Sequence, residues 1–307
     1  MASRTRQTTT SGLQHEIHID GQRAVVCEVG ATLRSYTFAG RPVVDGFEAD
    51  EMCRDGRGQV LAPWPNRLGD GRYQFDGTAT EAALNEPSRS NAIHGLVRWL
   101  PWHAESKASN AVTMACVLHA QPGYPWQLRL TLEYQLGDSG LSVSATATNE
   151  SKAVAPFGIG FHPYLTVGTK TVDSVRLRLG AHRELLTDER GLPTGSTLVA
   201  GSDHDFSAGP LLGATRLDTC FCQFERDDTG LAWVELEQPG GPRTSVWMDQ
   251  HFPYAMVYSG DHAGTRPRGS IAIEPMSCPP DAFRSGTDLV RLGAGGSWTG
   301  RWGITPT

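Results

Sequence analysis

Apolar and polar residues alternate one by one along many short segments of this sequence. The clearest are RLTLEYQL (129–136), LSVSATATN (141–149), VDSVRLRLG (172–180) and LAWVELEQ (231–238). Successive side chains of a β-strand point to opposite faces of a sheet, so this alternation predicts strands buried on one face only. No stretch of a dozen residues carries the apolar stripe of an amphipathic helix. The pattern therefore indicates an all-β chain with few or no helices.

Turn-forming residues separate these segments. Asp20-Gly21 lies between two strand-like segments near the N-terminus, and GDSG (137–140) joins two of the segments above, so both positions predict hairpins. The 307 residues include 35 Gly and 19 Pro, which supply many further turns. Many short strands joined by turns are typical of antiparallel sandwiches and barrels. We predict one large antiparallel β-sandwich domain over residues 12–307, preceded by a flexible tail at residues 1–11.

Composition excludes several classes of protein. The net charge is −6 and no Lys/Arg-rich run occurs, which argues against a nucleic-acid partner. The apolar runs are shorter than the roughly 18 residues that span a membrane, and no apolar segment follows MASRTRQTTTSG to form a signal peptide. Six scattered cysteines do not indicate a disulfide framework, and Cys220 and Cys222 lack a second pair with zinc-ligand spacing. We expect a cytoplasmic protein that binds no membrane and no metal.

Two segments place polar side chains beside residues that shape the backbone. Asn66 and Arg67 follow a Pro-Trp-Pro run, and their amide and guanidinium groups suit a polyhydroxylated ligand. His94 precedes a glycine that permits close backbone approach, and Arg98 and Trp99 follow. Aromatic rings stack on the C–H faces of sugars, so this composition favours a sugar site. The alternatives are an arginine that closes a loop and a structural histidine.

Three further candidates carry titratable groups. His162 lies within FGIGFHPYL (157–165), where it is either a core histidine or a proton donor in an apolar-walled pocket. Glu274 ends the apolar strand IAIE, so burial should raise its pKa toward the range of a general base. The alternative for Glu274 is a salt bridge at a sheet edge. Asp218, in TRLDTCFCQF, either accepts hydrogen bonds from sugar hydroxyls or is a turn residue.

Together these segments resemble the aldose 1-epimerase (mutarotase) family. The resemblance rests on NRLGDGRYQFDG, NAIHG, GIGFHPYL, LDTCF and IEPMSCPPDAF, in that order and across most of the chain. It implies a large β-sandwich of the galactose-mutarotase type, with a sugar in an open cleft on one sheet. It also implies a small-molecule sugar substrate, no cofactor, and a monomer or homodimer.

The resemblance assigns roles to individual residues. It implies that His162 is the general acid and Glu274 the general base, and that the substrate is bound by Asn66, Arg67, His94 and Asp218. After His94-Gly95 the galactose-mutarotase pattern has a second glycine and a Gly-Phe-Asp stretch, whereas this chain has Leu-Val-Arg98-Trp99. That departure resembles a bacterial branch that includes sulfoquinovose mutarotases. Arg98 is therefore a candidate contact for an anionic sugar substituent or a loop-closing residue, and Trp99 a candidate substrate contact.

Mutarotation requires one base and one acid. The C1 hydroxyl loses a proton while the ring oxygen gains one, the ring opens, and reclosure gives the other anomer. We expect a neighbouring carboxylate to keep His162 charged, apolar walls to raise the pKa of Glu274, and the two residues to lie a sugar ring's width apart. The alternatives are a non-catalytic carbohydrate-binding or regulatory protein, which needs no such pair, and a glycoside hydrolase, which needs two carboxylates.

Overall fold

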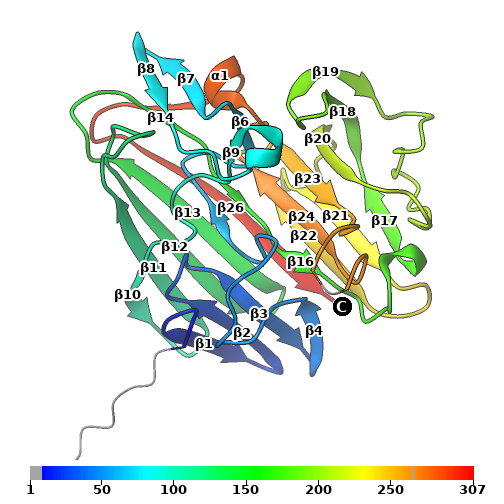
Figure 1. Ribbon diagram of the computed structural model, residues 1–307. Helices are drawn as coiled ribbons and strands as arrows, with labels where there is room; N and C mark the ends of the chain where they lie inside the picture. Colours follow the sequence, from blue (N-terminus) through cyan, green and yellow to red (C-terminus); the bar gives the residue numbers. More distant parts are fainter. Residues whose placement is uncertain (1–8, 265) are drawn as a thin grey trace, which may run out of the picture.

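The computed structural model describes residues 9–264 and 266–307 and is built almost entirely of antiparallel strands (Figure 1). The first sheet has twelve strands, and a continuous path of ten crosses it in the order β1 (Gln14–Ile19), β2 (Gln22–Cys27), β3 (Leu33–Phe38), β4 (Arg41–Val44), β16 (Tyr164–Leu165), β24 (Ile271–Met276), β23 (Tyr254–Tyr258), β20 (Asp218–Phe224), β18 (Ala181–Thr187) and β19 (Pro193–Leu198). Beside this path, β15 (Gly160–Phe161) pairs with β24 and with β5 (Val60–Leu61).

The second sheet has eight strands. They follow the order β10 (His103–Lys107), β11 (Ala111–Leu118), β12 (Leu128–Gly137), β13 (Gly140–Asn149), β26 (Ser297–Pro306), β22 (Arg243–Met248), β21 (Ala232–Glu237) and β17 (Arg176–Leu179). Figure 1 shows the C-terminal strand β26, in red, crossing the middle of this sheet. The last strand of the chain therefore joins the two halves of the second sheet.

Short elements complete the fold and gather largely at one end of the sandwich (Figure 1). Three two-stranded sheets are β6 (Arg67–Gly69) with β9 (Asn91–Ile93), β7 (Arg72–Phe75) with β8 (Thr78–Glu81), and β14 (Ala155–Phe157) with β25 (Val290–Leu292). The helical turns are α1 (Ala282–Ser285) and the 3-10 turns Pro87–Arg89 and Val172–Ser174. The all-β prediction is confirmed. No helix within the described ranges is long and apolar enough to cross a membrane.

The predicted strands and hairpins are found with small shifts. Strands β12 and β13 pair along their whole length, and their burial alternates residue by residue. Asp20 and Gly21 both have positive φ, as a tight two-residue hairpin requires, and they join β1 to β2. The strand predicted from residue 172 begins only at Arg176, because Val172–Ser174 form a 3-10 turn.

The core lies between the two large sheets. Alternate side chains of both sheets form one continuous buried cluster. Phe161 on the first sheet contacts Trp302 on the second, with ring centroids 4.9 Å apart, and both are almost fully buried. Cys220 and Cys222 face one side of β20 in a separate buried cluster, as their spacing predicts, and all six cysteines are free thiols.

Residues 1–8 of the predicted tail lie outside the described residues. Ser11, within the predicted tail, is buried, and its backbone N–H and hydroxyl both donate to the carbonyl of Ala49. The described part of the tail is therefore hydrogen-bonded to a loop of the domain.

Candidate active site

A cavity of about 420 Å³ opens on the first sheet, beside the central strand β24. Its lining includes every predicted site residue except Trp99: Asn66, Arg67, His94, Arg98, His162, Asp218 and Glu274. These residues come from segments that are far apart in the sequence. The side chain of Trp99 is 48% exposed and lines a different, smaller hollow that also includes Cys53.

His162 and Glu274 are in direct contact. His162 lies between β15 and β16, and its backbone is held by hydrogen bonds to Gln59 and from Gly58. Glu274 lies on β24, next to β16, and its side chain reaches the imidazole: Nε2 and Oε1 are 3.3 Å apart. The expected separation of a sugar ring's width is therefore wrong. The contact still suits the reaction, because the two oxygens that exchange protons are both bonded to C1.

Neighbouring residues fix the imidazole of His162. The ring of Tyr164 stacks on it, with centroids 5.1 Å apart and planes 16° apart. Gly56, at φ +75°, packs against the imidazole so closely that a Cβ there would lie 2.8 Å from Cδ2. The guanidinium of Arg57 lies over the ring of Tyr164 at 4.3 Å, and His94 meets His162 edge-on at 5.3 Å. These contacts leave the imidazole little freedom to rotate.

Burial controls the charges of the pair. It lowers the pKa of His162 to about 3, because water does not solvate the imidazolium, and the positive charges of Arg98 and Arg57 add to this effect. Burial also raises the pKa of Glu274 well above its usual value, and Asp218 adds to this effect. The expectation that a carboxylate would keep His162 charged is therefore wrong, because desolvation is the largest influence on the pKa of His162. Burial therefore favours a neutral imidazole beside a protonated carboxyl group.

His94 and Asn66 depend on special backbone conformations. His94 has φ +65°, and its N–H donates to the carbonyl of Asn66, which has φ +54°. A Cβ at Gly95 would lie 2.1 Å from the carbonyl oxygen of Ala62, so only glycine permits this close approach. Burial, with His162 nearby, holds the pKa of His94 well below its usual value, so this imidazole is neutral. The Oδ1 of Asn66 accepts the N–H of Arg67, which gives Asn66 a structural contact at the cavity wall.

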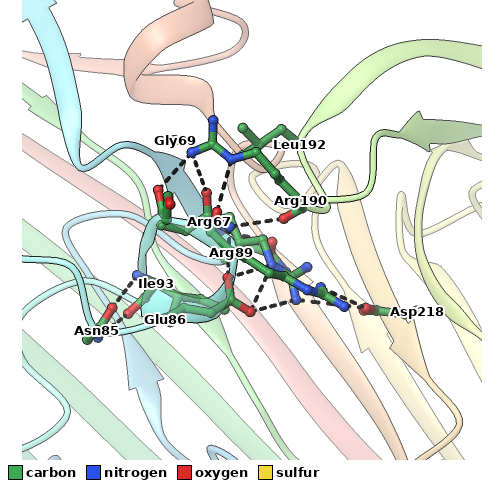
Figure 2. Close-up of polar contacts among 12 residues, drawn as sticks. Arg67, Gly69, Asn85, Glu86, Arg89, Ile93, Arg190, Leu192 and Asp218 are labelled. Atoms are coloured by element: carbon green, nitrogen blue, oxygen red, sulfur yellow. Dashed lines mark hydrogen bonds and ion pairs between the residues drawn. The ribbon is translucent and has the colours of Figure 1, made fainter.

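A charged network forms another part of the cavity wall (Figure 2). Arg67, on β6, donates to both carboxylate oxygens of Glu86, with its Nε 3.0 Å from Oε2. Asp218, at the start of β20, lies farther from two guanidinium groups, 3.8 Å from Arg67 and 4.0 Å from Arg89. The Asp218 side chain is 47% exposed, so its oxygens remain accessible from the cavity.

Arg98 lines the same cavity without a carboxylate partner. No Asp or Glu among the described residues lies within ion-pair distance of its guanidinium, which is 5.7 Å from the ring of Trp99. Burial lowers the pKa of Arg98 from its usual value, yet a guanidinium remains charged at neutral pH. The structure thus places an unpaired positive charge at the cavity.

Sequence reasoning missed several residues that line the cavity, namely Asp55, Gly56, Glu86, Arg89, Ile93, Tyr258 and His262. Glu86 precedes Pro87, as Glu274 precedes Pro275, but a polar turn surrounds Glu86 and no apolar strand leads to it. The one local feature that could have pointed to Glu86 was the proline that follows it, as a proline follows Glu274. Among residues 9–264 and 266–307, no three His, Cys, Asp or Glu side chains cluster closely enough to hold a metal ion.

Comparison with known proteins relates this chain to a family. A family model described as aldose 1-epimerase matches residues 14–305. The Escherichia coli K12 protein YihR, described as uncharacterized, is 35% identical over 273 residues, which cover 89% of this chain and 86% of that protein. A second E. coli protein described as uncharacterized, YphB, is 22% identical over 283 residues, 89% of this chain and 92% of that protein.

Solved structures share the architecture. A galactose-mutarotase/aldose-epimerase homologue from C. elegans superimposes with a TM-score of 0.87 at 20% identity, over 96% of this chain and 98% of that one. A structure described as a putative aldose 1-epimerase from E. coli K12 gives a TM-score of 0.83 at 20% identity, over 96% and 99% of the two chains. The predicted galactose-mutarotase-like sandwich is thereby confirmed.

Proposed function

This chain belongs to the aldose 1-epimerase family, and from that membership we propose that it interconverts the α and β anomers of a cyclic sugar by acid–base ring opening and reclosure. The observation that carries the proposal is the buried contact between His162 Nε2 and Glu274 Oε1, 3.3 Å apart at a cavity of monosaccharide size. One acid and one base at a single carbon are what the reaction needs.

The pair shares one proton throughout the proposed cycle. When sugar binds, the proton moves from Glu274 to His162 across their 3.3 Å contact. The Glu274 carboxylate then accepts the proton of the C1 hydroxyl while the His162 imidazolium donates to the ring oxygen. The charged pair thereby becomes a neutral imidazole and a carboxyl group, which is the arrangement that burial favours. Reclosure on the other face of C1 reverses both transfers and restores the pair. No net proton is gained or lost in a turnover.

Another part of the cavity wall supplies contacts for sugar hydroxyls. Asp218 accepts hydrogen bonds, and Arg67 donates them from the guanidinium N–H groups that do not contact Glu86. His94, held neutral by burial, adds one donor or acceptor. We propose these three residues, with Asn66 at the adjoining wall, as the substrate-binding set. The cytoplasmic location and the monomer or homodimer stay predictions.

We propose a sugar with an anionic substituent as a second, more specific substrate. The specific observation is Arg98, an unpaired guanidinium at the cavity. The Leu-Val-Arg-Trp sequence that follows His94-Gly95 also resembles the branch that includes sulfoquinovose mutarotases. Trp99 lies outside the cavity lining, so it is proposed only as a neighbour of Arg98, in cation–π contact with it.

Polarimetry or NMR exchange on freshly dissolved α-anomers of glucose, galactose and sulfoquinovose tests the proposed activity. His162→Asn and Glu274→Gln should each lower kcat by about 10²–10⁴-fold, the usual contribution of a positioned acid or base. Full activity in Glu274→Gln would rule out the assigned base. Release of the aryl group from an aryl glycoside would instead indicate a hydrolase, and sugar binding without exchange would indicate a binding protein.

A further inference from the structure

The carboxylate of Glu86 holds one edge of the Arg67 guanidinium (Figure 2). The Nε of Arg67 lies 3.3 Å from Oε1 and 3.0 Å from Oε2, and Nη2 lies 3.2 Å from Oε1. A planar guanidinium gripped by two oxygens along one edge has a fixed plane as well as a fixed position. Its Nη1 and the outer hydrogen of Nη2 are not used by this grip.

Glu86 is itself held rigidly. Its backbone forms a bridge with Asn91, each N–H donating to the other carbonyl, and Pro87 follows it. Asn91 is fully buried and donates from Nδ2 to Oε2 of Glu86 at 2.8 Å and to the carbonyl of Arg190 at 2.9 Å. The loop that carries Glu86 is thus tied to β9 and to the loop around Arg190.

A glycine lies against the guanidinium of Arg67. Gly191, at φ +75°, is so close that a Cβ there would lie 2.6 Å from Nη1 of Arg67. The neighbouring Arg190 ties this loop down by donating to the carbonyls of Arg89 and Ser90. The guanidinium is therefore held by Glu86 on its edge and by Gly191 beside it.

The second carboxylate near Arg67 is arranged differently. Asp218 lies 3.8 Å from Nη2, beyond hydrogen-bond distance, and its side chain is 47% exposed, whereas the Glu86 side chain is 19% exposed. Both oxygens of Glu86 already accept hydrogen bonds from Arg67, and Oε2 also accepts one from Asn91. The carboxylate oxygens of Glu86 are thus used in hydrogen bonds within the protein, while those of Asp218 are available to a ligand.

We propose that Glu86 is a positioning residue: it grips one edge of Arg67 so that the remaining N–H groups of the guanidinium, together with Asp218, face a sugar in the cavity. The sugar in this inference rests on the proposed function, whereas the contact between Glu86 and Arg67 rests on geometry alone. Burial opposes ionisation of Glu86, but the hydrogen bonds from Arg67 and Asn91 hold the pKa of Glu86 below its usual value, so the grip persists at neutral pH.

A double-mutant cycle on anomer exchange tests the proposal. Glu86→Gln places an amide N–H against the donors of Arg67 and should raise KM about tenfold while kcat changes by less than about twofold, because a hydroxyl contact made throughout the reaction is weakened. Arg67→Lys keeps the charge but cannot be gripped along an edge. In the Arg67→Lys background, Glu86→Gln should therefore change KM by less than about twofold.

Two variants serve as comparisons. Glu81→Gln removes a similar Arg–Glu contact, with Arg72 on the exposed β7–β8 hairpin, and should leave both kinetic constants unchanged. Glu86→Asp keeps the negative charge but is one methylene too short to reach both Nε and Nη2, so KM should rise as in Glu86→Gln. Wild-type kinetics in Glu86→Asp would mean that only the charge of residue 86 matters. A fall in kcat in Glu86→Gln, with the losses of the two single variants multiplying in the double variant, would mean that Glu86 acts on the sugar itself. Either result overturns the proposal.

A measurement without sugar separates this proposal from the proposed function. The ¹⁵Nε–H NMR signal of Arg67, identified by its absence in Arg67→Lys, should shift and exchange faster with water in Glu86→Gln. An unchanged signal overturns the grip even if the enzyme is active. A changed signal in a protein that exchanges no anomers would support the grip and contradict the proposed function instead.

Discussion

Nε2 of His162 lies 3.3 Å from Oε1 of Glu274, and these residues are only 5% and 2% exposed. Burial moves their pKa values in opposite directions, lowering that of the histidine to about 3 and raising that of the glutamate. The two groups therefore act as one unit that holds a single proton over a wide pH range.

The pH dependence of catalysis should be broad. Below the lowered pKa of His162 the pair gains a second proton and has no base, and above the raised pKa of Glu274 it loses its only proton and has no acid. We therefore expect kcat/KM to be bell-shaped, with its acid limb well below the ordinary histidine pKa of about 6.5. Initial rates of anomer exchange across pH, corrected for the uncatalysed reaction, measure this. An acid limb near the ordinary histidine value that disappears in His162→Asn would contradict it.

The ionised carboxylate of Glu274 should destabilise the folded protein at alkaline pH. Its folded-state pKa is raised, so between the unfolded value and the folded value the folded protein binds more protons, and stability falls as pH rises. Glu274→Gln removes this penalty, which is about 1.4 kcal/mol for each unit by which the pKa is raised. Urea unfolding should find Glu274→Gln more stable than wild type at about pH 9, with a smaller difference at about pH 5. A difference that did not change with pH would refute the linkage.

Gly56→Ala should impair catalysis through the imidazole. The added Cβ would lie 2.8 Å from Cδ2 of His162, so the ring must shift, and a displacement of about 1 Å at a catalytic group costs about 10²-fold in rate. We expect kcat to fall at least tenfold with a smaller change in KM.

Gly21→Ala is the matched control for this variant. Gly21 has φ +77°, close to the +75° of Gly56, but a Cβ there meets no atom within 4 Å. It should share the backbone strain of about 1–2 kcal/mol and keep full activity. Equal kinetics in the two variants would show that Gly56 does not position His162.

Gly191→Ala should displace Arg67 in the same way. A Cβ at this position would lie 2.6 Å from Nη1, so the guanidinium must leave its place beside Glu86. We expect KM to rise about tenfold with little change in kcat, since a substrate contact is affected and the acid–base pair is not. Gly201→Ala, with the same φ of +75° and no atom within 4 Å, should behave as wild type. A fall in kcat alone would count against the assignment of Arg67 to binding.

Arg98→Gln should discriminate among sugars. If the unpaired guanidinium contacts an anionic substituent, its loss should lower kcat/KM for sulfoquinovose by about tenfold or more and leave glucose and galactose nearly unchanged, since a hydrogen bond to a charged group contributes about 1.5–3 kcal/mol. Trp99→Ala, which changes a residue outside the cavity lining, should affect all three sugars little. Equal losses on all three sugars in Arg98→Gln would dismiss the anion contact.

The sequence predicted which residues line the cavity better than it predicted their charges. Pro275 after Glu274 and the glycine after His94 are local signals, and the cavity lining includes both residues. Glu86 was missed because its Glu-Pro pair lies in a polar turn and its importance depends on Arg67, 19 positions away in the sequence. Trp99 was included for its aromatic ring, but its side chain lies outside the lining because the backbone turns after Arg98.

By itself, the sequence determined the class of fold, because side-chain alternation and turn residues are local properties that permit only antiparallel strands. It also determined which residue types were available for acid–base chemistry. Only the tertiary structure decided that His162 and Glu274, 112 positions apart, touch each other and have pKa values shifted in opposite directions. Their charges depend on how completely the surrounding strands exclude water, and desolvation is a property of the assembled sheet that no segment of sequence contains.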